Sequence, residues 1–480
     1  MNRLYIIILV IAVIISNTVT SQTSFIKRTI DGERVTGINT GDLDNDGDLD
    51  IVVCNRLKNR IVFWRNDGGT PVQFTKVNID SVFNAPMYNY IKDVNNDGRL
   101  DVIASSSANG VVAVWLNNGG TPIGWTKQII AEGFSNAHSV YADDINGDGF
   151  IDIISSCGTS LNQVAWWKNS GSEPIVWSKN VVATNFRGSQ TIMTSDINGD
   201  NRPDIVAAAS DDDEIAWWRN EGGDTVRWTK FVVTKDIDLP HWIYACDIDL
   251  DNDIDILGAG YLSTEISLWK NEGGDTIKWT KQFIASYFGC PLTVHAADFD
   301  NDSKLDVIAT GYVDDVIGYW KNNGGNPIKW TYASIVNGYN GPWPLSACDL
   351  DNDGDNDIIA GADILNSPGT AAPLTWWENK FILNDVDDKD NIKLNYNLKQ
   401  NYPNPFNPLT QIDYSIPKKE YVNLDIYNSI GKKILSVINK LQEVGNYSVV
   451  VDMNSFCSGV YFCRLQAGTF CQTRKLILLK

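Results

Sequence analysis

The nine residues DLDNDGDLD at positions 42–50 decide how this chain folds, because the same acidic pattern occurs seven times. The copies follow one another every 51 or 52 residues and begin at Asp42, Asp93, Asp144, Asp196, Asp247, Asp298 and Asp349. Such a constant spacing indicates one supersecondary unit repeated along the chain. Most of the protein is therefore predicted to be an array of similar units.

Each copy has Asp at positions 1, 5 and 9 and Asp or Asn at position 3. Short oxygen side chains at this density are the ligands that Ca²⁺ prefers. We predict up to seven Ca²⁺ sites, one per unit, and assign positions 1, 3, 5, 7 and 9 to them. The site residues are Asp42, Asp44, Asp46, Asp48, Asp50, Asp93, Asn95, Asp97, Arg99, Asp101, Asp144, Asn146, Asp148, Phe150, Asp152, Asp196, Asn198, Asp200, Arg202, Asp204, Asp247, Asp249, Asp251, Asp253, Asp255, Asp298, Asp300, Asp302, Lys304, Asp306, Asp349, Asp351, Asp353, Asp355 and Asp357.

Position 6 of the loop needs a permissive backbone, which glycine provides. Four copies have glycine there, at Gly47, Gly98, Gly149 and Gly354. The other copies have Asn201, Asn252 and Ser303, and we expect these three loops to be the weaker sites.

A plain turn and an EF-hand are the alternatives to this kind of calcium loop. Asp, Asn and Gly make good turns without any ion. However, carboxylates about 4 Å apart repel by roughly 4 kcal/mol per pair at an effective dielectric constant near 20. An EF-hand needs Glu at position 12 and flanking helices, whereas position 9 here leads into β-branched stretches such as DIVV from Asp50.

Net charge agrees with the calcium interpretation. The chain has 39 Lys and Arg against 59 Asp and Glu, for a net charge of −20. Seven bound Ca²⁺ ions would bring the net charge to −6, so most of the excess acidic residues are accounted for as calcium ligands. Nucleic acid is not expected as a partner, because phosphate binding needs clustered cations.

Each unit reads as four short strands, with the acidic loop after the first and a Gly-rich turn such as NDGG after Arg65 before the last. Seven such units predict an all-β, seven-bladed propeller over residues 22–383. An open solenoid is the alternative. The last unit lacks a fourth strand, and residues 24–31 resemble one, so we expect them to complete the last blade and close a ring.

Tryptophan recurs once per unit in the third strand, for example at Trp64 and Trp115. Such a ladder could stack sugars, but it more commonly fills the gap between adjacent sheets. Trp166, Trp217 and Trp376 lie on the other face of that strand, so we expect some of them to be exposed.

These repeats resemble the FG-GAP or VCBS family over about residues 24–380, a family that includes the propeller head of integrin α subunits. The resemblance implies a calcium-loop propeller that is often used in adhesion. It also implies that ligands meet the face opposite the calcium loops. On that side, the residue six positions before each loop differs from repeat to repeat, and binding specificity could be encoded there. The candidate ligand-binding residues are Met87, His138, Gln190, His241, Leu292 and Trp343.

Those six residues could equally be unconstrained loop tips. No nucleophile elbow, phosphate loop or transition-metal spacing is present in the sequence. We therefore expect a non-catalytic module that binds a glycan or a surface protein. A calcium-dependent polysaccharide lyase or hydrolase, or a structural surface-layer protein, are the alternatives.

The N-terminus is predicted to be a secretory signal peptide over residues 1–21, since MNR precedes an apolar run and a small-residue site. The run is too short for a membrane-spanning helix. No integral membrane span is expected in the mature chain.

The tail differs in composition from the repeats. An acidic linker at residues 384–392 precedes residues 393–480, which have 11 Lys or Arg against 5 Asp or Glu. Short alternating strands there predict a small, Ig-like β-sandwich. NYPNPFNP from Asn401, IYNSIGKKI from Ile426, SGVYFCRL from Ser458 and the terminal RKLILLK resemble a type A sorting domain of type IX secretion. The resemblance implies recognition by that machinery and release from, or display on, a Bacteroidetes-like cell; an accessory carbohydrate-binding sandwich is the alternative.

Overall fold

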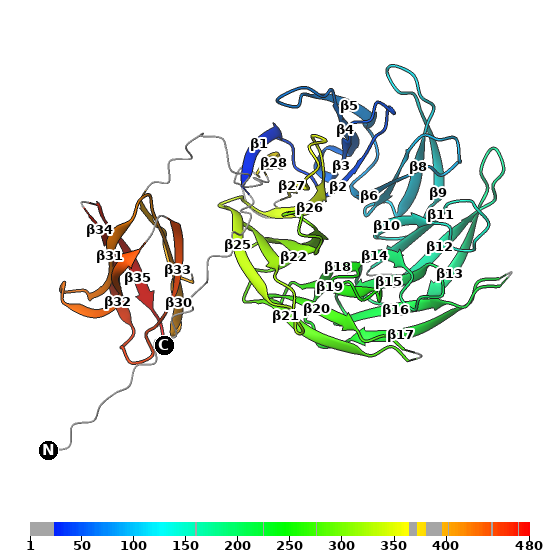
Figure 1. Ribbon diagram of the computed structural model, residues 1–480. Helices are drawn as coiled ribbons and strands as arrows, with labels where there is room; N and C mark the ends of the chain where they lie inside the picture. Colours follow the sequence, from blue (N-terminus) through cyan, green and yellow to red (C-terminus); the bar gives the residue numbers. More distant parts are fainter. Residues whose placement is uncertain are drawn as a thin grey trace. The chain divides into compact units, whose positions relative to one another are not determined.

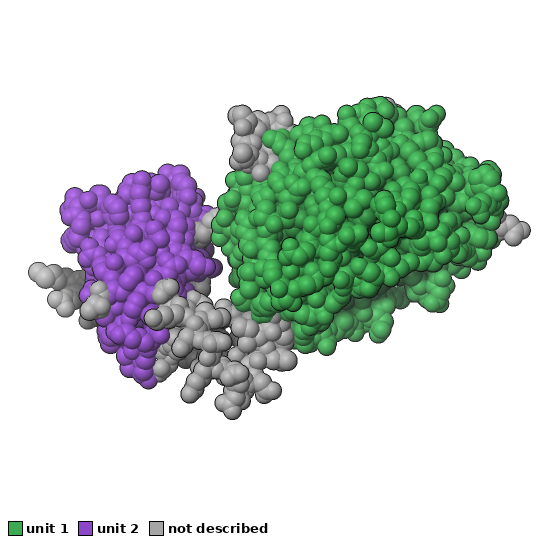
Figure 2. Space-filling view, turned by 90° about the horizontal axis from the view of Figure 1, so that it is seen from above, with its two compact units in different colours: residues 1–384 green, residues 385–480 purple. Residues whose placement is uncertain are grey.

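The computed structural model divides into two compact units, Met1–Asn384 and Asp385–Lys480 (Figure 2). It describes residues 24–158, 161–223, 225–274, 276–363, 372–380, 396–401, 403–442, 445–468 and 470–480. The predicted signal peptide, residues 1–21, and the predicted linker, residues 384–392, lie outside these ranges. Among the described residues, no helix is long and apolar enough to cross a membrane.

The described part of the first unit contains seven four-stranded antiparallel sheets, here called blades 1 to 7 (Figure 1). Blades 1 to 3 are β2(Gly37–Gly41), β3(Asp50–Asn55), β4(Arg60–Asn66), β5(Phe74–Asp80); β6(Pro86–Lys92), β7(Asp101–Ser106), β8(Val111–Asn117), β9(Trp125–Ala131); and β10(Ala137–Asp143), β11(Asp152–Cys157), β12(Gln163–Asn169), β13(Trp177–Ala183). Blades 4 and 5 are β14(Ser189–Ser195), β15(Asp204–Ala209), β16(Glu214–Asn220), β17(Trp228–Thr234); and β18(Pro240–Cys246), β19(Asp255–Gly260), β20(Glu265–Asn271), β21(Trp279–Ser286). Blades 6 and 7 are β22(Pro291–Ala297), β23(Asp306–Gly311), β24(Val316–Asn322), β25(Trp330–Asn337); and β26(Pro342–Cys348), β27(Asp357–Ala362), β28(Leu374–Asn379), β1(Phe25–Asp31).

The blades are arranged in a ring, with the first strand of each blade innermost (Figure 1). The first strand of the chain, β1, pairs antiparallel with β28 and supplies the outer strand of blade 7. The predicted all-β propeller class is confirmed. Each acidic loop lies between the first and second strands of its blade, and its position 9 opens the second strand.

Neighbouring blades pack face to face through apolar side chains. Phe63 of blade 1 and Trp115 of blade 2 belong to one core cluster, and both are almost fully buried. The expected exposure of Trp166, Trp217 and Trp376 is wrong, because each is at most 3% exposed. They pack toward the next blade, since both faces of every blade have a neighbour in a ring. The tryptophans therefore act as core residues.

The second unit is a β-sandwich of two sheets around one core. One sheet contains β29(Asn397–Leu398), β30(Leu409–Ile416) and β33(Gly445–Asp452). The other contains β32(Lys433–Gln442), β31(Glu420–Asn428), β34(Gly459–Ala467) and β35(Phe470–Leu478). Apolar side chains of both sheets, including Ile412 and Leu465, form the shared core.

Candidate functional site

The acidic loops share one hydrogen-bonded frame, seen in the loop of blade 1. Asp42 at position 1 accepts hydrogen bonds from the backbone N–H of Asp46, at 3.1 Å, and of Gly47, at 2.9 Å. Asp46 at position 5 accepts one from Asp48, at 3.0 Å. The same three bonds form in all seven loops. The carboxylates are thus held in place by the backbone that they fold around.

Position 9 is the buried floor of each loop. Asp50 is fully buried and accepts hydrogen bonds from the backbone N–H of Leu43 and of Asn66, at 3.0 and 2.8 Å. Burial, assisted by repulsion from Asp44 and Asp46, raises the pKa of its carboxyl to about 7. A nearby cation would offset both effects.

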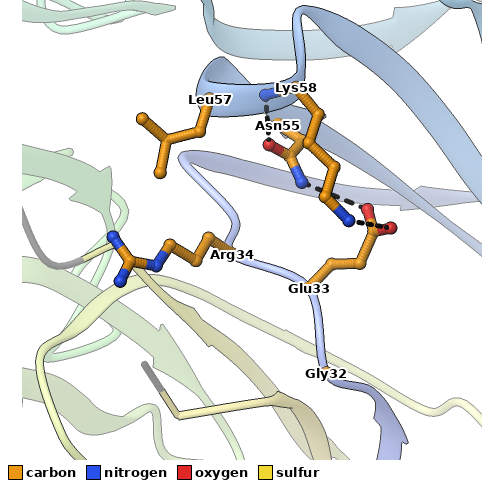
Figure 3. A pocket seen from close by; sticks show the side chains of 6 residues that line it. All are labelled: Gly32, Glu33, Arg34, Asn55, Leu57 and Lys58. Carbon is orange, nitrogen blue, oxygen red and sulfur yellow. Dashed lines mark hydrogen bonds and ion pairs between the residues drawn. The ribbon is translucent and has the colours of Figure 1, made fainter. Parts of the chain in front are cut away.

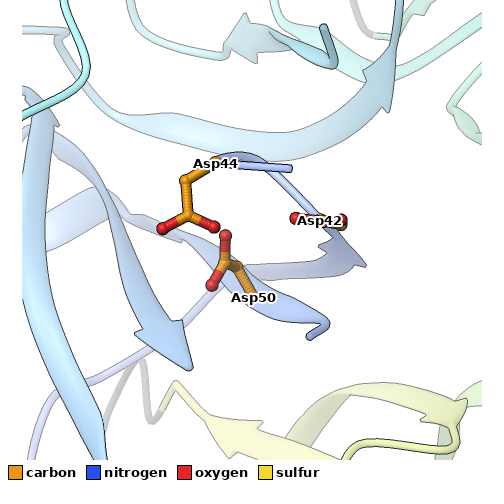
Figure 4. A group of neighbouring side chains, drawn as sticks. All are labelled: Asp42, Asp44 and Asp50. Carbon is orange, nitrogen blue, oxygen red and sulfur yellow. The ribbon is translucent and has the colours of Figure 1, made fainter. Parts of the chain in front are cut away.

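The carboxylates leave room for a hard cation. In blade 1, oxygens of Asp42, Asp44 and Asp50 lie within 4.8 Å of one another, and the carboxylates of Asp44 and Asp50 face each other (Figure 4). Comparable groups occur in blades 5, 6 and 7. The position 3 atoms that are buried without a hydrogen-bond partner in these four loops are Oδ1 of Asp44, Asp249 and Asp351 and both carboxylate oxygens of Asp300. Unpaired buried carboxylate oxygens are the donors that Ca²⁺ takes, so positions 1, 3, 5 and 9 fit the ion.

Position 7 differs from the predicted ligand set. Arg99 and Arg202 form ion pairs with position 5 of their own loops, and Lys304 does so at 3.0 Å. Phe150 has no polar side-chain atom. In these loops only the backbone carbonyl of position 7 could serve as a ligand.

Two positions of each loop adopt left-handed backbone. At position 6, φ is 96° at Gly47 and 67° at Ser303. Position 4 is also left-handed, with φ of 59° at Asn45 and 64° at Leu250. Leucine is poorly suited to this conformation, so the loop of blade 5 carries two non-glycine residues at strained positions.

One residue of the site was missed from the sequence. Each third strand ends in an asparagine, here called a clamp asparagine: Asn66, Asn117, Asn169, Asn220, Asn271, Asn322 and Asn379. The Nδ2 of Asn117 donates to the carbonyl of Leu100 in its own loop and to that of Leu43 in the preceding loop, at 3.1 and 2.7 Å. Asn66 contacts Leu350 of blade 7 in the same way, at 3.0 Å. The clamps thereby link the loops into a closed ring, and the repeated Asn before each Gly turn was the available sequence signal.

The six candidate ligand-binding residues lie near the starts of the innermost strands. They are not loop tips: Met87, His138, His241, Leu292 and Trp343 are at most 8% exposed, and Gln190 is half-buried. Each lies six residue steps before position 1 of its loop, which is about 20 Å along the strand. They therefore converge around the ring's axis, away from the acidic loops.

Five aromatic side chains form what we call the axial cluster: Tyr88, His138, His241, Trp242 and Trp343. The Tyr88 ring lies 5.1 Å from that of His138 and 5.3 Å from that of Trp242, and its hydroxyl accepts a hydrogen bond from Trp343. The Nδ1 of His138 and of His241 donates to the backbone carbonyls of Gln190 and Leu292. Burial lowers the pKa of these imidazoles to about 4 and 3, so both are neutral at pH 7.

Charged and aromatic groups border this cluster. The Arg56 guanidinium lies 5.9 Å from the Trp343 ring centroid and pairs with Asp363 at 2.7 Å. Tyr261 and Tyr312 pack beside the cluster and are partly exposed. The partly exposed rings of this region are therefore Trp242, Tyr261 and Tyr312, which surround the buried Trp343.

A hollow of about 270 Å³ lies where blade 7 meets blade 1 (Figure 3). It is lined by Gly32, Glu33, Arg34, Asn55, Leu57 and Lys58. Glu33 accepts contacts from Asn55 and Lys58, both at 3.1 Å. The hollow's buried carboxylate, Glu33, is already neutralised by ion pairs with Lys58 and Arg60.

Comparison with known families agrees with this geometry. The FG-GAP-like repeat matches residues 42–104, 93–155, 144–207, 196–258, 247–309 and 298–360, together more than half of the chain. The chain belongs to the FG-GAP-like repeat family. Each matched window opens at position 1 of one loop and continues through the next, so six windows contain seven loops. FG-GAP repeats commonly bind calcium, and the loops supply acidic groups for it.

The secretion system C-terminal sorting domain matches residues 400–479. This domain marks proteins that Bacteroidetes export by type IX secretion, so the chain reaches the cell surface or the extracellular space and its tail meets that machinery.

Several solved structures are similar to this chain at low sequence identity. A crystal structure of BBS1N in complex with ARL6DN has a TM-score of 0.50 and 9% identity, covering 76% of this chain and 99% of that one. PorZ, a surface component of the type-IX secretion system of Porphyromonas gingivalis, has a TM-score of 0.46 and 9% identity, and the match covers 90% of this chain and 58% of that one. A Lactobacillus plantarum protein has a TM-score of 0.44 and 14% identity, and the match covers 63% of this chain and 85% of that one. No curated protein matches the chain.

Proposed function

We propose that residues 22–383 form a calcium-stabilised, non-catalytic binding module for a glycan or a surface protein, exported through residues 393–480. Up to seven Ca²⁺ ions would be held by positions 1, 3, 5 and 9 of the loops, with a backbone carbonyl from position 7. Calcium would supply rigidity: it would neutralise each loop and fix the turn between two strands.

The axial cluster is the observation that carries the binding role. Trp242, Tyr261 and Tyr312 would offer partly exposed ring surface, backed by the buried Trp343 and the neutral His138 and His241. Arg56 adds a cation beside them. Aromatic faces with a few polar groups are typical of ligand sites. The strands that carry these groups are held by the loops at their other ends, which links calcium to ligand binding.

The test is binding of the full chain to a glycan and polysaccharide array, in millimolar calcium and in EDTA. We expect calcium-dependent, saturable binding that Trp242→Ala and Arg56→Ala each reduce at least tenfold. Tyr287→Ala is the control, because this aromatic residue is 88% exposed outside the cluster. Its binding should equal that of the wild type.

The other outcomes discriminate the alternatives. Release of shortened products from pectin, alginate or ulvan would favour a lyase or hydrolase and contradict the non-catalytic role. A folded chain that neither retains nor cleaves a glycan, and captures no surface protein, would favour a structural surface-layer component.

A further inference from the structure

We propose that Lys270 competes with the cation in the loop of blade 5 and makes this loop a weaker calcium site than the loop of blade 1. The inference rests on the proposed calcium binding. The two loops form a matched pair because both carry Asp at positions 1, 3, 5, 7 and 9: Asp42, Asp44, Asp46, Asp48 and Asp50 in one, and Asp247, Asp249, Asp251, Asp253 and Asp255 in the other.

In blade 5 an ammonium group lies among the ligand carboxylates. The Nζ of Lys270 is 3.1 Å from Asp251 Oδ2 and forms a second ion pair with Asp249. Oxygens of Asp247, Asp249 and Asp251 lie within 4.8 Å of one another. The side chains of Lys270 and Asp249 are only 20% and 16% exposed, so solvent screens this pair weakly, whereas Asp251 is 37% exposed. The lysine already provides positive charge to positions 3 and 5.

In blade 1 the basic residue at the same register, Arg65, forms its ion pair outside the loop, although its charge still acts on Asp44. Arg65 precedes the clamp asparagine as Lys270 does, but its guanidinium pairs with Asp67 at 2.5 Å. Arg219 of blade 4 pairs with Glu221, also two residues on, at 2.7 Å. The planar guanidinium suits this local pairing, whereas a flexible ammonium reaches further. Among the described residues, no basic side chain forms an ion pair with position 1, 3 or 5 of the blade 1 loop.

The consequence is a difference in calcium affinity between loops with the same ligands. A divalent ion entering blade 5 must displace the ammonium or bind beside it, and both cost free energy. A unit charge near a divalent ion changes its affinity by about tenfold or more, even with strong screening. Blade 6 repeats the arrangement, with Lys321 paired to Asp300 and to Asp302.

The experiment is a calcium titration of the full chain followed by hydrogen exchange and mass spectrometry, which reads each loop through its own peptide. We expect the peptide over residues 247–255 to gain protection at about tenfold higher free calcium than the peptide over residues 42–50. Lys270→Leu should remove most of that difference, and the remainder is the expected effect of Leu250 and Asn252 at positions 4 and 6. Lys270→Arg should also remove most of the difference while keeping the charge, because Glu272 lies where Asp67 and Glu221 lie.

Arg65→Lys is the reciprocal variant and should raise the calcium midpoint of the blade 1 peptide alone. Equal midpoints in the wild type, or a blade 5 midpoint that neither Lys270 variant moves, would overturn the proposal while leaving calcium binding intact. A shift in Lys270→Leu without one in Lys270→Arg would overturn the pairing geometry. Absence of calcium protection in every loop would instead contradict the proposed function.

Discussion

The two ends of each blade differ in how closely they repeat. At the acidic-loop end, positions 1, 5 and 9, the clamp asparagine and the hydrogen bonds of position 1 recur in all seven blades. At the axial end, the same register holds Met87, His138, Gln190, His241, Leu292 or Trp343. The acidic-loop end therefore has the same structure in every blade, whereas the residue at the axial end differs from blade to blade.

The difference shows what constrains each end. A loop that gathers carboxylates can only be built in a few ways, because the backbone must supply the N–H donors that hold them. The axial end faces no such repeated demand, since each side chain meets a different neighbour across the ring axis. Regularity therefore marks the scaffold, and variation marks the region where a ligand can be distinguished.

Removal of calcium should have the largest effect on the regular end. We expect EDTA to lower the Tm of the propeller transition by more than about 10 °C, because each site filled at a hundred times its Kd contributes roughly 2.7 kcal/mol. Differential scanning calorimetry of the full chain measures it. The sandwich transition is the internal control and should not move; an unchanged propeller transition would contradict calcium binding.

Loss of a clamp should rank second. Asn117→Ala removes the donor to the buried carbonyl of Leu43 and to the partly buried carbonyl of Leu100, so we expect a loss of about 2–4 kcal/mol in free energy of unfolding. Urea unfolding measures it. Asn118→Ala is the matched control, because the side chain of that exposed neighbour bonds to Thr126 at 3.0 Å and its loss should change stability by about 0.5 kcal/mol or less. Equal losses of stability in the two variants would contradict a stabilising role for the clamp asparagine.

The sequence predicted the regular end better than the variable one. Positions 1, 5 and 9 and the closing strand follow from local pattern and repeat counting. The sequence alone assigned no role to the clamp asparagines, because Asn117 bonds to Leu43 of the preceding blade, which is 74 residues away along the chain. The burial of His138 and Trp343 depends on seven strands meeting at one axis, which no single repeat contains. The position of Lys270 over its loop likewise depends on how strands pair.

The axial histidines should make stability depend on pH. Their pKa is lowered in the folded chain, to about 4 for His138 and 3 for His241, so the unfolded chain binds more protons between about pH 4 and 6.5. Stability is complete above that window and is lost as pH falls through it. His138→Gln, which introduces the residue that blade 4 has at this register, should reduce the dependence by about 1.4 kcal/mol per pH unit.

Urea unfolding at several pH values in saturating calcium measures this effect. Comparison with the wild type separates the histidine from carboxylates, whose contribution is common to both proteins. The variant His138→Gln with His241→Gln should show twice the reduction. Parallel curves for wild type and variants would mean that the imidazoles are not buried as neutral groups.

The smallest effect concerns the one loop that departs from the regular backbone chemistry. Leu250 occupies position 4 of the blade 5 loop with φ of 64° and is 55% exposed, so its side chain gains little packing to offset the left-handed backbone. All six other loops have Asn or Gly at this position, including Asn45 and Gly147. Leu250→Asn should therefore stabilise the propeller by about 0.5–1 kcal/mol.

Leu262→Asn is the matched control for that change. Leu262 is equally exposed, at 55%, and lies in the same blade without a left-handed backbone. If a more polar surface were responsible, both variants would stabilise the chain equally. If backbone conformation is responsible, only Leu250→Asn raises the urea midpoint, and it does so in EDTA as well as in calcium, because relief of backbone strain does not need the ion.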